Sequence, residues 1–227
     1  CDCIDAWRDV NRSDRESIMT QPDQRATERT RARYQRISGL YDLMEILPER
    51  RYIPWRENLW EQVHGPRVLE IGVGTGKNMP FYPPEIEITA IDLTPGMLAR
   101  AHKRATELDL NVNLQLGDTQ ALDFPDKYFD SVIATFVFCS VPDAVLGLRE
   151  IRRVLKPAGQ LFLLEHMRAR NSALGLLMDV LNPLVVRMMG ANINRHTVNN
   201  VQAADFKKAD VTNLSADGIF KYILAYK

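Results

Sequence analysis

Three glycines at alternate positions, Gly72, Gly74 and Gly76, close an apolar stretch that begins at Val68. An apolar run that ends in glycines is typical of a buried strand followed by a tight turn. Glycine reaches backbone conformations with positive φ, and it leaves no side chain between a ligand and the peptide groups. The sequence therefore predicts a turn that holds a ligand against bare main chain.

Two carboxylates narrow the class of ligand. Asp92 follows the apolar stretch 86–91, about where nucleotide-binding folds place an acid on the ribose hydroxyls. A dinucleotide site needs a third glycine in the pattern G-x-G-x-x-G, and Lys77 stands at that position here. Asp118, after the stretch 113–116, could accept a hydrogen bond from an adenine amino group. The pattern indicates an adenosine that lacks a pyrophosphate.

The elements that position these residues alternate between strand and helix from residue 67 onward. Such alternation is typical of a parallel sheet with helices on both faces, and it predicts an α/β fold. Thr94-Pro95 and Pro142-Asp143 are predicted to begin helices, and the stretch from Lys156 to Gly159 is predicted to end the second one. The predicted strands cover 67–71, 86–91, 113–116, 129–136, 160–164, 205–212 and 219–226.

Two helical segments lie outside this alternation. Residues 24–64 are predicted to form a helical lid, with a break at Pro48 because proline interrupts a helix. Residues 170–201 are rich in leucine, valine and methionine but are interrupted by polar residues, so we expect an insertion that caps the binding site. Residues 1–23 are predicted to be a disordered stretch or an extension, which leaves 24–227 as a single domain.

Composition excludes several classes of protein. Lys+Arg and Asp+Glu are both 29 in the 227 residues, so no basic excess indicates a nucleic-acid partner. Three cysteines make no disulfide framework, which favours a reducing cytoplasm. Cys1-x-Cys3 is followed by no second pair of ligands, so no metal site is predicted there. The sequence has no apolar run of transmembrane length and no signal peptide, and we expect a cytoplasmic protein.

Five motifs in this order resemble the class I S-adenosylmethionine-dependent methyltransferases. The motifs are Glu70-x-Gly72-x-Gly74-x-Gly76, Asp92, Gly117-Asp118, Phe129-Asp130-Ser131-Val132 and Leu155-Lys156-Pro157-x-Gly159. The resemblance covers residues 30–227. It implies a Rossmann-like three-layer sandwich with a seven-stranded sheet, six strands parallel and the last antiparallel. It also implies S-adenosyl-L-methionine as cofactor and S-adenosyl-L-homocysteine as product.

By position, the resemblance implies a set of cofactor-binding residues. The three glycines would face the methionine part and the ribose, and Asp92 would hold the ribose. Asp118, with the backbone of Thr119 and Gln120, would hold the adenine. The remaining implied contacts are Glu70, Thr75, Asn78, Leu93, Met97, Thr135 and Phe136.

Four further stretches resemble the bacterial phosphatidylethanolamine N-methyltransferases. The stretches are Arg33 to Met44, Phe138 to Pro142, Leu164-Glu165-His166, and Leu181 to Leu184 leading to Gly190 through Arg195. This resemblance implies transfer of methyl groups to the amine of phosphatidylethanolamine and its methylated intermediates. The apolar segment 174–189 and the basic N-terminal helix would dock on an anionic membrane surface, at the inner face of the cell membrane.

The chemistry of such an acceptor assigns further roles. Methylation creates a quaternary ammonium, which aromatic faces stabilise by cation–π attraction. Candidates for an aromatic cage are Tyr34, Tyr41, Phe136 and Phe138. Arg187 or Arg195 would bind the phosphate. The amine must lose a proton before attack, and His166 is the candidate base, with Tyr41 as the second.

A metal-free transfer is predicted, and two alternative functions stay open. Metal-dependent catechol methyltransferases place acidic ligands near the end of the fourth strand, where the first acid here is Asp143. Cys139 is predicted to be a buried structural thiol. One alternative is a C-methyltransferase of ubiquinone or menaquinone biosynthesis, which shares the N-terminal helix and a membrane-resident substrate. The other is a protein that binds S-adenosylmethionine without catalysis.

Overall fold

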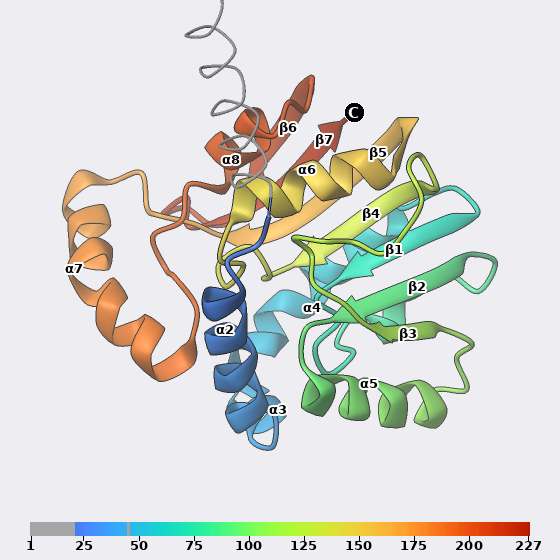
Figure 1. Ribbon diagram of the computed structural model, residues 1–227. Helices are drawn as coiled ribbons and strands as arrows, with labels where there is room; N and C mark the ends of the chain where they lie inside the picture. The colour runs from blue at the N-terminus through green and yellow to red at the C-terminus, as the bar shows by residue number, and fades with distance from the viewer. Residues whose placement is uncertain (1–20, 45) are drawn as a thin grey trace, which may run out of the picture.

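A sheet of seven strands organises the part of the chain that the computed structural model describes, residues 21–44 and 46–227 (Figure 1). The strand order is β3-β2-β1-β4-β5-β7-β6. β7 is antiparallel to both of its neighbours and the other six strands are parallel, which confirms the predicted fold class. The strands are β1 (Arg67–Ile71), β2 (Glu87–Asp92), β3 (Asn113–Leu116), β4 (Phe129–Thr135), β5 (Leu155–His166), β6 (Lys208–Asn213) and β7 (Phe220–Tyr226).

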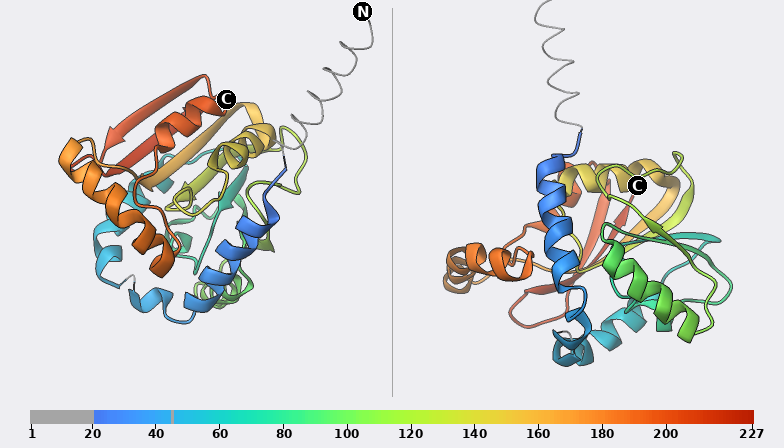
Figure 2. Two further views of the ribbon diagram at one scale, coloured as in Figure 1. Left: turned by 60° about the vertical axis from the view of Figure 1, so that its left-hand side comes forward. Right: turned by 60° about the horizontal axis from the view of Figure 1, so that its bottom comes forward.

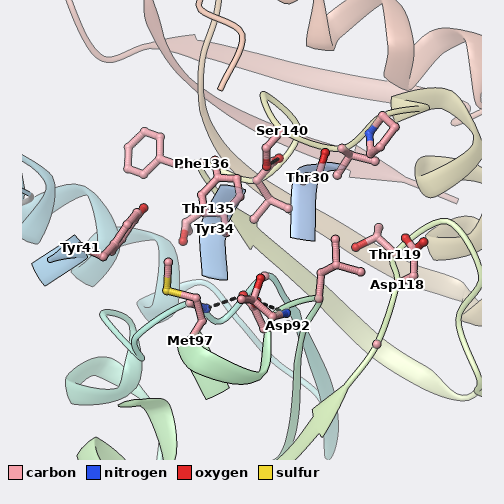
Figure 3. A pocket seen from close by; sticks show the side chains of 18 residues that line it. Thr30, Tyr34, Tyr41, Asp92, Met97, Asp118, Thr119, Thr135, Phe136 and Ser140 are labelled. Carbon is pink, nitrogen blue, oxygen red and sulfur yellow. Dashed lines mark hydrogen bonds between the residues drawn. The ribbon is translucent and has the colours of Figure 1, made fainter. Parts of the chain in front are cut away.

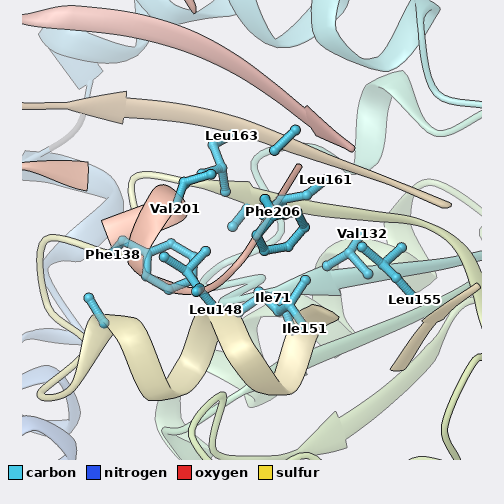
Figure 4. Packing of buried hydrophobic residues seen from close by; sticks show 14 of the residues in the cluster. Ile71, Val132, Phe138, Leu148, Ile151, Leu155, Leu161, Leu163, Val201 and Phe206 are labelled. Carbon is cyan, nitrogen blue, oxygen red and sulfur yellow. The ribbon is translucent and has the colours of Figure 1, made fainter. Parts of the chain in front are cut away.

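Helices cover both faces of the sheet, so its central strands are buried on both sides. α4 (Ile46–Glu61) and α5 (Pro95–Glu107) contribute to the core on one face. α6 (Ala144–Val154) and α8 (Thr197–Ala203) contribute to the core on the other. Figure 4 shows Leu148 and Ile151 of α6 packed against the sheet. Each is fully buried, which stabilises the fold by about 1.5–3 kcal/mol per side chain.

Three helices lie where the parallel strands end. α2 (Gln24–Ile37) packs beside α5, α3 (Tyr41–Met44) follows it, and α7 (Ser172–Met189) stands apart from the sheet (Figures 1 and 2). A short 3-10 helix, η1 (Met79–Phe81), follows the glycine turn. Asp23 caps α2 by accepting hydrogen bonds from two backbone N–H groups of its first turn. These helices are the predicted lid and cap, whose roles stay predictions.

The predicted break in the N-terminal helices is wrong in position. The helix ends before Gly39, where 38–40 form a turn between α2 and α3. Pro48 lies in the first turn of α4, where a backbone N–H has no hydrogen-bond partner within the helix, so the N–H that proline lacks is not needed. The prediction for 1–23 concerns residues that lie largely outside the described ones.

The boundaries of five predicted strands also differ, those of β2 and β7 by one residue. β5 begins at Leu155 instead of 160, because the stretch that was predicted to end the preceding helix does so and also forms a bulge opposite β4. β4 ends at Thr135, since Phe136 adopts a positive φ of 59° that no strand continues. β6 begins at Lys208 instead of 205, after Asp205 with φ 63°. None of the described helices combines the length and the apolar character that crossing a bilayer requires.

Candidate active site

The glycine turn follows β1, and its three glycines are needed for different reasons. All three have positive φ, at 65°, 56° and 82°. A Cβ on Gly72 would lie 2.6 Å from the Val137 side chain, and one on Gly76 would lie 2.6 Å from the Met79 sulfur. A Cβ on Gly74 would meet nothing closer than 3.9 Å. Gly74 therefore presents open main chain to a cavity, whereas Gly76 shapes the turn from behind and lines no cavity described here.

Asp92 ends β2 beside this turn. Its Oδ2 accepts a hydrogen bond from the Gly74 N–H at 3.0 Å, and its Oδ1 accepts one from the Thr94 N–H at 2.8 Å. Each carboxylate oxygen keeps a second lone pair, so Asp92 can accept from two neighbouring hydroxyl groups. Burial raises the pKa of Asp92 above its ordinary value, although both N–H groups oppose that shift. Figure 3 shows Asp92 at the floor of a cavity.

Asp118 follows the next strand, β3, and its carboxylate accepts more hydrogen bonds than that of Asp92 does. Its carboxylate accepts hydrogen bonds from the Gln120 backbone N–H at 2.9 Å and from the Thr27 hydroxyl at 3.3 Å. The Gln120 side chain donates to the same carboxylate and to Thr27, and it accepts from the Asp143 N–H. α2 is therefore fastened over this end of the cavity. Thr119 lines the cavity, whereas the Gln120 side chain does not.

We call this space the Asp92 cavity. Its floor is main chain and carboxylates at the ends of β1, β2 and β3. The predicted cofactor residues Leu93, Met97, Thr135 and Phe136 also line it. Tyr34 and Tyr41, from the N-terminal helices, close it on the far side (Figure 3).

A second space, which we call the His166 cavity, adjoins the first. Ile37, Tyr52 and Arg56 line it from the N-terminal helices, and His166 and Phe220 line it from β5 and β7. The two cavities share a wall. That wall consists of Tyr34, Tyr41, Gly72, Gly74, Thr135 and Phe136.

A buried polar network lies at the base of the His166 cavity. The Asn78 side chain donates to Glu70 at 2.7 Å and to the Thr135 hydroxyl at 3.0 Å. The Tyr82 hydroxyl donates to the other Glu70 oxygen. Burial raises the pKa of Glu70 to about 7, although these two donors oppose the shift. Glu70 and Asn78 thus line the His166 cavity and not the Asp92 cavity, and their role as cofactor contacts stays a prediction.

Arg56 of α4 completes this network, and sequence reasoning missed it. Its side chain donates to Asn78 and to Thr135, both at 2.8 Å, and it pairs with Glu49 at 2.8 Å. Its guanidinium lies 5.5 Å from the centre of the Phe136 ring. Arg56 is 5% exposed. Nothing in the sequence distinguishes it from the other arginines of these helices, because its burial depends on how α4 docks.

Asp42 of α3 ties the lid to the glycine turn. It accepts a hydrogen bond from the Thr75 hydroxyl at 2.7 Å and pairs with Lys77 at 3.1 Å. Arg100 and Arg104 of α5 lie at 3.4 and 3.7 Å. Partial burial would raise the pKa of Asp42, but the hydrogen bonds from Thr75 and Lys77 outweigh it and lower that pKa. Thr75 is part of this tether and also lines the His166 cavity, and its role as a cofactor contact stays a prediction.

His166 and several aromatic rings face one another in the second cavity. The His166 ring stacks near Phe136 at 6.3 Å, and its Nε2 lies 3.3 Å from the Asn192 carbonyl oxygen. Burial lowers the pKa of His166 below its ordinary value. Tyr52 packs against Phe136 at 4.6 Å and against Phe220 at 5.6 Å. Tyr52 and Phe220 were not predicted, since helix and strand periodicity alone did not indicate which residues meet here.

Phe138 does not belong to this aromatic group. It is fully buried in the core beside α6 and lines neither cavity. The positive φ of Phe136 turns the chain, and the Glu165 carboxylate accepts hydrogen bonds from the Val137 and Phe138 N–H groups at 2.8 and 2.9 Å. This turn sends the Phe138 ring toward Leu148. The prediction of Phe138 as a cage residue is therefore corrected.

Neither of the two arginines predicted to bind phosphate lines either cavity. Arg187 is exposed on α7. Arg195 is half-buried and donates to the Val141 carbonyl oxygen at 2.9 Å. Cys139 is buried, as predicted for a structural thiol, but it also lines the His166 cavity.

Known proteins share this domain. Residues 69–163 match a protein-family model described as a methyltransferase domain. A phosphatidylethanolamine N-methyltransferase of Cereibacter sphaeroides is 39% identical over 104 residues, which are 45% of this chain and 51% of that protein. A demethylmenaquinone methyltransferase of Deinococcus radiodurans is 33% identical over 58% of this chain and 56% of its own length. The human thiol S-methyltransferase TMT1A is 30% identical over 66% of this chain and 63% of its own length.

Solved structures show the same fold. A SAM-dependent methyltransferase of Thermotoga maritima, described as a possible histamine N-methyltransferase, superposes with a TM-score of 0.67 at 22% identity, covering 86% of this chain and 99% of that one. A phosphoethanolamine N-methyltransferase of Haemonchus contortus, solved with phosphomonomethylethanolamine and S-adenosylhomocysteine, gives 0.61 at 16% identity, covering 77% and 53%.

These matches define the fold and the type of domain that the central residues resemble. Residues 69–163 match a methyltransferase domain, and the fold is that of the S-adenosylmethionine-dependent methyltransferases, in agreement with the resemblance predicted from the glycine turn and the carboxylates. The chain spans 51%, 56% and 63% of the lengths of the three curated relatives named here. Their acceptors differ from one another.

Proposed function

We propose that this chain binds S-adenosylmethionine in the Asp92 cavity and methylates the amine of phosphatidylethanolamine and its methylated intermediates. The amine would enter the His166 cavity. The observation that carries this proposal is the wall that the two cavities share, formed in part by Gly74, Thr135 and Phe136. A methyl group held on one side of such a wall is within reach of a nucleophile on the other.

The residues of the first cavity fit the proposed cofactor. Gly74 leaves its Cα face open for close approach, and Asp92 keeps two lone pairs for a ribose diol. Thr119 and Met97 border the space that an adenine ring would fill. When bound, S-adenosylmethionine supplies an electrophilic methyl group on a sulfonium. The chain itself binds, orients and excludes water.

The second cavity suits an amine that becomes a fixed cation. Aromatic faces and edges surround this cavity, and they favour an alkylated ammonium over water. The rings belong to Tyr34, Tyr41, Tyr52, Phe136 and Phe220. An attacking amine must first be neutral, and His166 at the cavity wall is the candidate proton acceptor. Tyr41, which lines both cavities, is the second candidate.

Exposed apolar side chains near these cavities support a membrane-resident acceptor. On α7 they are Leu176, Leu177, Val180, Leu181, Leu184 and Met188. On and beside α3 they are Leu40, Leu43, Met44 and Ile46. α2 adds exposed basic residues, among them Arg29 and Arg36, which an anionic lipid surface would attract. We propose that these faces dock on the inner leaflet of the cell membrane, and that the protein is otherwise cytoplasmic.

The acceptor is the property that an experiment must decide. Purified protein would be given methyl-labelled S-adenosylmethionine with vesicles of phosphatidylethanolamine, with a demethylmenaquinone in neutral lipid, or with an alkyl thiol. We expect label in the phospholipid. Label only in the quinone or only in the thiol would replace this acceptor with that of another relative. Cofactor binding without transfer to any of the three would favour the non-catalytic alternative.

The proposed role of His166 has its own test. His166→Gln keeps the size and polarity of the side chain but removes the basic nitrogen, so we expect turnover to fall about 10²–10⁴-fold. Affinity for S-adenosylmethionine, measured by calorimetry, should stay unchanged. His102→Gln, at an exposed position on α5, is the matched control. An unchanged rate in His166→Gln would remove His166 as the base and leave Tyr41.

A further inference from the structure

Three side chains of different chemistry converge where β5 ends. Cys139 follows β4, and Glu165 and His166 are the last residues of β5. Each of the three offers one ligand atom, and these atoms all lie within 4.8 Å of one another. Cys139 and His166 line the His166 cavity, so the group can be reached from that space.

The carboxylate of Glu165 provides an independent observation that points to a ligand. One carboxylate oxygen, Oε1, accepts hydrogen bonds from the Val137 and Phe138 N–H groups. The other oxygen, Oε2, is buried and has no hydrogen-bond partner among the described residues. Glu165 is 0% exposed. A buried acceptor without a partner destabilises the fold, and a bound cation would remove that loss.

His166 is held as a metal-bound histidine is commonly held. A histidine that ligates a metal through one ring nitrogen usually donates its other N–H to a carbonyl oxygen or a carboxylate. The Asn192 carbonyl oxygen, 3.3 Å from Nε2, is such an acceptor. Asn192 is itself fixed, because its backbone and side-chain N–H groups both donate to the Cys139 carbonyl oxygen at 2.9 Å. The residue that orients His166 therefore also anchors Cys139.

We propose that Cys139, Glu165 and His166 bind a Zn²⁺ ion, with the fourth ligand position open toward the His166 cavity. A sulfur, a nitrogen and an oxygen ligand suit zinc, and three protein ligands with one open position are typical of accessible zinc sites. Bond lengths of about 2.0–2.3 Å place tetrahedral ligands roughly 3.5 Å apart. Because the ligand atoms lie within 4.8 Å of one another, the side chains need to approach by about 1 Å to bind the ion.

A zinc ion bound by these three side chains would form a complex with no net charge. A thiolate and a carboxylate together balance the two positive charges of zinc. Arg195, whose guanidinium interacts with both Cys139 and Glu165, opposes binding. A lone pair of His166 that holds zinc cannot accept a proton from the acceptor. Zinc occupancy and general-base action by His166 therefore exclude each other, and zinc is an inhibitor of any transfer that depends on a free His166.

Metal titration tests this site without any methyl acceptor, so its outcome does not depend on the proposed function. Cys1→Ser/Cys3→Ser protein leaves Cys139 as its sole thiol, since the chain has three cysteines. We expect one Co²⁺ per chain with a near-ultraviolet thiolate-to-cobalt band, displaced by one Zn²⁺. The proposal is overturned if this protein binds no stoichiometric metal, or if the band persists after Cys139→Ser is added.

Two further variants keep the test decisive if Cys139→Ser unfolds. His166→Gln should weaken zinc by more than the 10–100-fold that loss of an outer partner causes, whereas His102→Gln should bind as the parent does. Arg195→Gln removes the opposing charge and should tighten zinc severalfold. Unfolding curves without metal identify any variant that is misfolded. Equal zinc affinity in the parent, His166→Gln and Arg195→Gln would overturn the assignment.

Discussion

The Asp92 cavity and the His166 cavity share a wall but are built by different means. The first is main chain and carboxylates at the ends of adjacent parallel strands, where the sheet fixes them. The second is mostly side chains from α2, α3, α4 and β7 and from the loop after α7, whose positions depend on how these segments dock. Among related proteins, a site at the edge of the sheet can keep its structure while the segments that dock beside it differ. The relatives agree with this difference, since their names specify three different acceptors.

Substitution of Arg56 should perturb the structure of the His166 cavity more than that of the Asp92 cavity. Arg56→Ala leaves Glu49, whose side chain is 12% exposed, without its partner and removes two hydrogen bonds, to Asn78 and to Thr135. Loss of one member of a buried charged pair destabilises a protein by about 3–5 kcal/mol. Urea unfolding measures this change, with the exposed Arg50→Ala as control. A loss below about 1 kcal/mol would mean that α4 is held by its apolar face alone.

Removing the Asp92 carboxylate should act on the first cavity. Asp92→Ala deletes the proposed acceptor for two ribose hydroxyls and frees the Gly74 N–H that it holds. Hydrogen bonds to a charged group contribute about 1.5–3 kcal/mol each, so affinity for S-adenosylmethionine should fall at least about a hundredfold. Calorimetry with Asp123→Ala, at an exposed position, provides the comparison. Retained affinity in Asp92→Ala would contradict the cofactor assignment.

Glu70 should make stability depend on pH. Its folded-state pKa of about 7 lies above the value of an unfolded glutamate, so the folded state binds this proton more tightly. The resulting stabilisation is fully present below the unfolded pKa and is lost as pH rises through 7. Between pH 5 and pH 8, wild type should lose on the order of 1–3 kcal/mol more than Glu70→Gln.

Urea unfolding at both pH values measures that difference. Glu57→Gln, at an exposed position on α4, should behave as wild type does. The same pH dependence in Glu70→Gln would assign the titration to another group and leave Glu70 ionised in the folded chain.

Substitution of Tyr52 should have the smallest effect of these variants, and this effect should be confined to binding of the acceptor. Tyr52→Leu removes ring contacts with Phe136 and Phe220, and aromatic pairs contribute about 0.5–1.5 kcal/mol. The KM for the acceptor should rise about 2–10-fold while affinity for the cofactor is unchanged. Tyr52→Phe should restore most of the loss. If cofactor affinity falls as well, the two cavities are less separate than their construction indicates.

The difference between the cavities also explains what the sequence could predict. Gly72, Gly74 and Asp92 lie where apolar periodicity stops, so local pattern alone placed them at one edge of the sheet. Arg56, Tyr52 and Phe220 reach the site only through the docking of α4 and the pairing of β7, which no local pattern encodes. The resemblance to known sequences also did not show which residues line a cavity. Phe138 and Arg187, which line neither cavity, are examples.

Small local departures from ideal geometry account for the other errors. Phe138 was misplaced because a single positive φ at Phe136 reverses which side of the chain faces the cavity. β5 was predicted too short because its bulge contains proline and glycine, which usually end an element. The turn at Phe136 lies in the site, where strained backbone is commonly found, whereas the bulge lies at the opposite ends of β4 and β5.

Asp42 has a consequence for how ligands in the two cavities would affect each other's affinity. It joins α3, which bears the Tyr41 side of the shared wall, to Thr75 and Lys77 of the glycine turn. A ligand that fixes the turn therefore also fixes part of the wall against which the other ligand packs. Thermodynamic reciprocity then requires the second ligand to strengthen the binding of the first by the same factor. An acceptor in its cavity would then strengthen the binding of the proposed cofactor.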